Sequence, residues 1–168
     1  MSIKLSLFKC FIIFIFGFLL GNAIKNVYEA STFQSYSWKE PPIIINCYKD
    51  MPEKVILEAI DYWAVRGHEF GFHEMNPSED LCKSGDYLEG FIIIKKDFFI
   101  KDPTTLATTY RYTSFGSIKG AIIKMRPRSH KLDLLLTHEL GHSLGFGHKE
   151  TRGHIMHPIY DEMGEDFY

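Results

Sequence analysis

The chain has 168 residues and a formal net charge of −2 at pH 7, from 19 Lys and Arg against 21 Asp and Glu. Nucleic-acid-binding domains carry a basic footprint, which this balance lacks, so we expect no nucleic-acid partner. A hydrophobic content of 45% excludes an intrinsically disordered chain.

The N-terminal segment, residues 1–23, predicts an export signal. Residues 11–20 (FIIFIFGFLL) are apolar, Lys4 and Lys9 precede them, and residues 21–23 (GNA) are suited to cleavage after Ala23. The run is shorter than the roughly 20 residues of a membrane span. We therefore expect a secreted or extracytoplasmic protein. The alternative is an uncleaved segment that anchors the chain, which would be its only membrane contact.

Removal of this signal leaves 145 residues, which suit one domain. Polar and aromatic residues without a sustained period indicate a linker or extended arm over 24–42, followed by a single catalytic domain over 43–168. Cys47 and Cys82 are an even pair in an exported chain. They form either a disulfide or two separate thiols, and the sequence leaves both open.

The first elements of this domain are a strand and a helix. Residues 43–48 (IIINCY) predict a buried strand, which we expect to be central in its sheet. Asp50 and Glu53 resemble a capping box, and apolar residues then recur at helical spacing as far as Gly67. We expect Trp63 of this helix to lie in the core.

The second half of the domain predicts further strands and one helix. Apolar, Thr-rich and Tyr-rich runs indicate strands at 91–94, 106–112 and 118–125. Leucines then repeat every four residues over 131–144, which predicts a helix stopped by Gly145. The remaining residues are typical of loops.

The second helix carries a metal-binding pattern. His138 and His142 are four residues apart, so both imidazoles project from one face. Glu139 lies beside the first ligand, where it can reach a water on the metal. Gly145 allows a turn that brings in His148 as a third ligand, and three ligands leave the fourth zinc position open for catalysis. The alternative is a helix with two surface histidines, which leaves the glycine and the third histidine unexplained.

The run HELGHSLGFGH over 138–148, followed by HIMHPIY over 154–160, resembles the metzincin zinc peptidases and is most similar to the matrixins. The resemblance implies an α+β zincin fold: a twisted mixed sheet, a backing helix, an active-site helix and a short C-terminal subdomain whose Met-turn places Met156 beneath the histidines. It further implies substrate contacts from Leu134, Pro158 and Tyr160 around an S1′ pocket and from Leu106 and Ala107 on an edge strand.

We therefore expect an exported zinc metalloendopeptidase that hydrolyses a protein or peptide substrate, with a zinc-activated water and Glu139 as general base. The alternative function is a weak or inactive zinc-binding interaction module on the same fold. We expect one zinc and a monomer. Neither calcium nor a second, structural zinc is supported, because no histidine lies within 74–129 and residues 124–126 (KMR) are not acidic.

Overall fold

The computed structural model describes residue 34, residues 36–83 and residues 87–168. The predicted export signal therefore lies outside the described residues. Within the described part of the chain, no helix combines the length and apolar character needed to cross a membrane.

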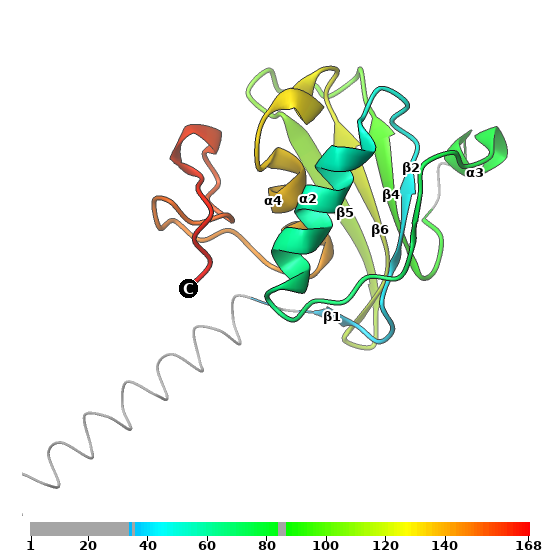
Figure 1. Cartoon of the computed structure of the whole chain (residues 1–168), viewed down its shortest axis with the longest axis horizontal. Coiled ribbons are helices and arrows are strands. Elements are labelled where there is room, and N and C mark those ends of the chain that lie inside the picture. Colours follow the sequence, from blue (N-terminus) through cyan, green and yellow to red (C-terminus); the bar gives the residue numbers. More distant parts are fainter. Residues whose placement is uncertain (1–33, 35, 84–86) are drawn as a thin grey trace, which may run out of the picture. The chain divides into compact units, whose positions relative to one another are not determined.

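The apolar runs of the sequence form a mixed six-stranded sheet (Figure 1). Strands β3, β2, β4 and β6 lie side by side in that order and are parallel. β5 pairs with β6 in the antiparallel sense, and β1 pairs in parallel with the start of β6. The strands are β1 (Ser37–Trp38), β2 (Ile43–Asn46), β3 (His73–Glu74), β4 (Phe91–Lys96), β5 (Ala107–Ser114) and β6 (Ser117–Met125).

The predicted central strand, β2, lies near one side of the sheet. β2 has partners on both sides, but its outer neighbour β3 has only two residues, so β2 lies beside the edge and is not the centre that we expected. β4 and β6 each have a neighbouring strand on both sides and occupy the middle. Their residues Ile92, Ile94 and Ile123 are completely buried, as expected for strands covered by other elements.

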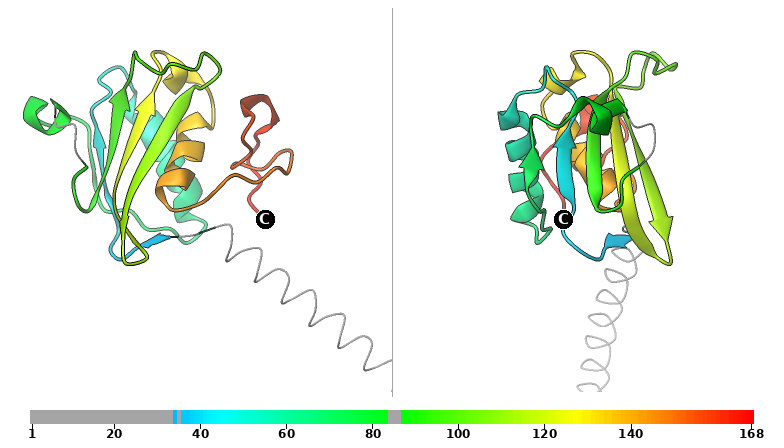
Figure 2. Two further views of the ribbon diagram at one scale, coloured as in Figure 1. Left: turned by 180° about the vertical axis from the view of Figure 1, so that it is seen from behind. Right: turned by 90° about the vertical axis from the view of Figure 1, so that its right-hand side faces the viewer.

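Two helices, α2 (Glu53–Ala64) and α4 (Leu135–Ser143), cover the same face of the sheet (Figures 1 and 2). Trp63 joins them: its Nε1 donates to the carbonyl oxygen of Thr137 at 2.8 Å, and its ring stacks on Phe146 with centroids 5.1 Å apart. Trp63 is 0% exposed, which confirms the predicted core position. The α+β fold with a backing helix is thus confirmed.

The predicted capping box at the start of α2 is wrong. The N-cap position is Pro52, whose φ of −65° already suits helix entry, and no side chain caps the helix there. Asp50 instead pairs with Lys96 at the end of β4. The Asp50 carboxylate therefore forms an ion pair with Lys96 and does not cap the helix, contrary to the prediction from the local pattern.

α4 begins later than the leucine repeat suggests. Residues 129–131 form a separate 3₁₀ turn, η1 (Ser129–Lys131), and Leu134 has a left-handed φ of 63°, so the helix begins only at Leu135. The segment that follows α4 has little regular structure besides η2 (Tyr160–Glu162). In Figure 1 it lies to the left of α4, on the side away from β2.

The sequence predicts neither β3 nor the short helix α3 (Glu79–Lys83). A disulfide between Cys47 and Cys82 ties α3 to the residue that follows β2. The structure therefore decides between the two alternatives for this pair in favour of the bridge.

Candidate active site

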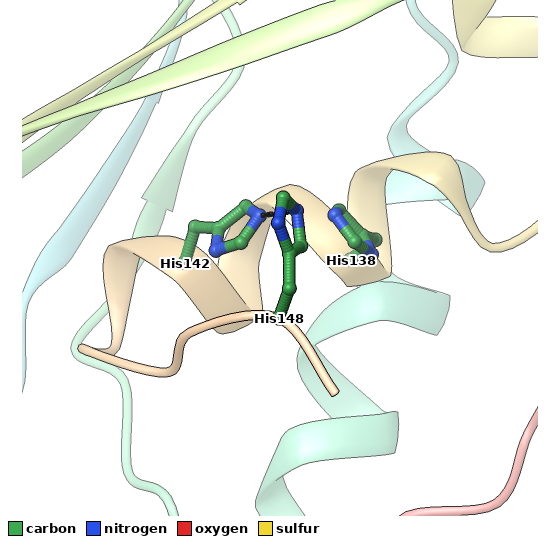
Figure 3. A group of neighbouring side chains, drawn as sticks. All are labelled: His138, His142 and His148. Atoms are coloured by element: carbon green, nitrogen blue, oxygen red, sulfur yellow. Dashed lines mark hydrogen bonds between the residues drawn. The ribbon is translucent and has the colours of Figure 1, made fainter. Parts of the chain in front are cut away.

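Three histidines converge beside α4 (Figure 3). His138 and His142 project from the same face of the helix, and His148 comes from the segment beyond it. One ring nitrogen from each lies within 4.8 Å of the others, and the Nε2 atoms of His142 and His148 are 3.1 Å apart. Two nitrogens bound to one tetrahedral zinc at about 2.0–2.1 Å would be about 3.4 Å apart. The spacing therefore fits a metal.

A turn at Gly145 makes this convergence possible. Its φ of +106° lies in the region that favours glycine, and it reverses the chain directly after the last turn of α4. The N–H of Phe146 then donates back to the carbonyl oxygen of Gly141 at 3.1 Å, which closes the turn. The chain can therefore bring His148 back over the histidines of the helix.

Backbone carbonyls orient the two helical histidines. Nδ1 of His138 lies 2.8 Å from the carbonyl oxygen of Ile155, and Nδ1 of His142 lies 2.9 Å from that of Phe146. A carbonyl can only accept, so each Nδ1 carries the proton and each Nε2 is left with its lone pair. This is the arrangement that outer contacts impose on histidine ligands of metals.

Burial keeps these imidazoles neutral. Desolvation lowers the pKa of His138 to about 4 and that of His142 to about 3, with the other histidines of the cluster adding to the effect. Burial also lowers the pKa of His148, the most exposed of the three. Neutral imidazoles at pH 7 are the form that binds a divalent cation.

Met156 packs directly against α4. It is completely buried, and a Cβ atom added to Gly141 would meet its Sδ as well as the Trp63 ring at about 2.5 Å or less. The N–H of Met156 donates to Nδ1 of His154 at 2.9 Å, which fixes the turn that also presents the Ile155 carbonyl to His138. Met156 thus supports the helix from which the histidines project.

Glu139 is buried, with 4% of its surface exposed. Desolvation raises the pKa of Glu139 to about 7, and a hydrogen bond from Thr109 opposes that shift. The Thr109 Oγ1 donates to Glu139 Oε2 at 2.5 Å. A carboxyl group with a pKa near neutrality is suited to general acid–base chemistry.

A cavity of about 560 Å³ runs between β5 and α4 past these groups. Its lining includes four of the five predicted substrate-contact residues, namely Leu106, Ala107, Pro158 and Tyr160. Leu135 lines it in place of Leu134, which borders a separate cavity beside α2. Leu134 precedes the helix and has a left-handed φ of 63°, so its side chain does not follow the helical direction that the leucine repeat predicts.

Among the lining residues without an assignment from the sequence are Thr109, Arg111 and His157. Nη1 of Arg111 donates to the carbonyl oxygens of His142 at 2.9 Å and Phe146 at 3.3 Å. Period-two alternation along the predicted strand could have placed residues 107, 109 and 111 on one face. It could not have identified α4 as the element that this face meets.

The sequence model of the family described as Matrixin matches residues 46–167, which covers every residue of the candidate site. No curated protein and no solved structure matches the chain.

Proposed function

The chain belongs to the matrixin family of peptidases, and on this basis we propose that it is an exported zinc endopeptidase. Matrixins use zinc and are generally extracellular. The observation that carries the proposal is the buried Glu139 beside three converging, neutral histidines on one open cavity. Hydrolysis requires a base beside an open metal position, whereas a purely structural zinc site is closed by a fourth protein ligand.

We assign His138, His142 and His148 as the zinc ligands. A zinc ion held by these three imidazoles would acidify a bound water molecule and polarise a substrate carbonyl. The carbonyls of Ile155 and Phe146 hold two of the three rings in position before any metal arrives. The site is therefore largely preorganised.

Glu139 is assigned as the general base. Its carboxylate accepts a proton from the attacking water and returns a proton to the leaving amine nitrogen. In the metal-free site burial raises the pKa of Glu139 to about 7, so that the carboxyl group can both accept and return a proton near neutral pH. Met156 packs against α4, the helix that carries Glu139 and two of the histidines.

The substrate is an extended peptide that lies along β5. Within the described residues β5 pairs only with β6, so the backbone groups of its other edge face the cavity side without a strand partner. An extended chain adds to such an edge through main-chain hydrogen bonds. Leu135, Pro158 and Tyr160 favour an apolar side chain after the scissile bond.

The direct test is cleavage of a flexible, denatured protein by the purified protein. We expect cleavage that stops on chelation and resumes with added zinc. Glu139→Gln should lower kcat at least about 10³-fold because it removes the proton acceptor. It should keep stoichiometric zinc, because the three histidines are unchanged. Glu150→Gln, at an exposed site outside the cavity, is the matched control.

Two results would refute parts of this proposal. Cleavage by the Glu139→Gln variant at the control rate would remove the base assignment. Stoichiometric zinc without cleavage of any flexible substrate would favour the interaction module. Export through residues 1–23 is a separate part, because that segment lies outside the described residues, and intact-mass measurement of exported protein tests it.

A further inference from the structure

Glu139 takes its only side-chain hydrogen bond within the described residues from the edge strand. Thr109 Oγ1 is 2.5 Å from Oε2 and 3.2 Å from the carbonyl oxygen of the same glutamate. The second carboxylate oxygen, Oε1, receives no hydrogen bond from the described part of the chain, yet it is not among the buried unpaired atoms. It therefore borders the open cavity, which Glu139 lines.

The position of Thr109 is fixed by the sheet. It pairs with Ile123 of β6, whose side chain is completely buried, and the β-bulge of this hairpin lies further along, between Tyr112 and Thr113. Two residues later on the same face, Arg111 also reaches α4, at the carbonyl of His142. β5 thus contacts α4 through two hydrogen bonds, one to the Glu139 carboxylate and one to the carbonyl oxygen of His142.

We propose that Thr109 is a positioning residue for Glu139, an inference that rests on the proposed peptidase function. Its hydroxyl holds Oε2, so that Oε1 faces the cavity and is the oxygen that accepts and returns the proton. A carboxylate whose rotamer is fixed by a neighbouring donor needs no reorganisation when the substrate reacts. In this role the Thr109 hydroxyl acts on the reaction only through the Glu139 carboxylate.

A purely structural contact between β5 and α4 would have different consequences. It would lower the stability of the fold when removed, with kcat, KM and zinc content unchanged in the folded fraction. A positioning contact instead lowers kcat while KM and zinc content stay the same, because substrate and metal are bound by other groups.

The test compares Thr109→Val, which replaces the hydroxyl by a methyl group, with Thr109→Ser, which keeps the hydroxyl. We expect Thr109→Val to lower kcat about 10- to 100-fold, the effect typical of lost outer contacts in metal sites, with KM and zinc content within about twofold. Thr109→Ser should recover kcat to within about threefold. Thr113→Val is the control, since Thr113 is an exposed threonine of the same strand outside the cavity.

A second readout does not depend on activity. Infrared difference spectra of protein labelled with ¹³C-glutamate, with the Glu139→Gln variant subtracted, isolate the Glu139 carboxylate band. The band should shift in Thr109→Val and return in Thr109→Ser. Should Thr109→Val fail to fold, Thr109→Ala replaces it, and an H₂O-to-D₂O shift of the wild-type band tests the hydroxyl contact without any variant.

An unchanged kcat together with an unchanged band in Thr109→Val overturns the proposal. A band shift with unchanged kcat also overturns it, because the contact would then exist without a role in the reaction. If the wild-type protein binds zinc but cleaves nothing, the proposed function fails, and the infrared comparison still decides whether Thr109 orients the carboxylate.

Discussion

The carbonyl oxygen of Tyr36 lies 2.0 Å from the point that a Cβ atom on Gly145 would occupy. The described part of the predicted arm, at Tyr36, therefore passes directly over the turn that ends α4. Nε1 of Trp38 donates to the carbonyl of Ser143 at 2.9 Å, and Nε2 of Gln34 donates to that of Leu144 at 3.0 Å. Side chains of the arm thus satisfy carbonyl groups at the end of the helix that a helix cannot satisfy itself.

Gly145→Ala should destabilise the protein by roughly 2–4 kcal/mol, from left-handed backbone strain together with the collision against a backbone oxygen. Urea denaturation of the metal-free protein measures this change. Gly116→Ala is the matched control, because Gly116 has a φ of +76° but open space around its missing Cβ. It should cost only about 1–2 kcal/mol. Equal costs at both positions would mean that the arm moves aside freely.

Arg111→Met should weaken zinc binding about 10-fold, as loss of outer contacts does in other metal sites. The carbonyl of Phe146 accepts both from Arg111 and from Nδ1 of His142, so loss of the guanidinium loosens the ring that this carbonyl orients. Competition against a metal chelator measures the affinity. Arg152→Met, at an exposed residue outside the cavity, should leave it unchanged. Equal affinities of the two variants would contradict this role.

The ionised form of Glu139 should destabilise the metal-free protein. Burial raises the pKa of Glu139 to about 7 in the folded state, above its ordinary value of 4.5. Below pH 4.5 the group is neutral in both states. Between pH 4.5 and 7 it ionises first in the unfolded chain, so the folded protein loses stability as pH rises.

Glu139→Gln removes this loss and leaves the histidines unchanged. Relative to wild type, the variant should gain roughly 1–3 kcal/mol between pH 4 and pH 8, measured by urea denaturation of metal-free protein. Glu150→Gln should show no such pH-dependent difference. A difference between Glu139→Gln and wild type that stays constant with pH would show that burial does not shift this carboxyl group.

Removal of the disulfide should affect stability and leave activity intact. Cys47 and Cys82 are 35 residues apart, and closure of a loop of that length stabilises by about 3–4 kcal/mol in the chain-entropy description. Neither cysteine lines the cavity. The doubly substituted Cys47→Ala, Cys82→Ala protein should unfold at lower urea concentration and cleave peptide at the wild-type rate at 25 °C. A reductant should destabilise only the wild type, and a loss below about 1 kcal/mol would count against the bridge.

Residue spacing along a single element determines which side chains share a face of that element. His138, Glu139 and His142 share one helix, whose 3.6-residue period fixes the relative directions of their side chains. The apolar runs that became β2, β4 and β6 and the helical period around Trp63 are equally local. The α+β fold and the convergence of the first two histidines were therefore predictable.

Contacts between elements depend on register and packing, which no short pattern encodes. Thr109 meets Glu139 across 30 residues only because β5 pairs with β6 at Ile123 and α4 lies on that face of the sheet. The same reason explains the capping error, since Asp50 finds Lys96 on another strand.

The amino-acid order by itself determined which groups can bind a metal and move a proton, because covalent spacing on a helix sets their directions. Only the tertiary structure decided what holds those groups in place: Thr109 on the carboxylate, the Ile155 carbonyl on His138, and the arm over Gly145. Each of these contacts joins segments distant in the chain, and their proximity arises from burial of the shared core.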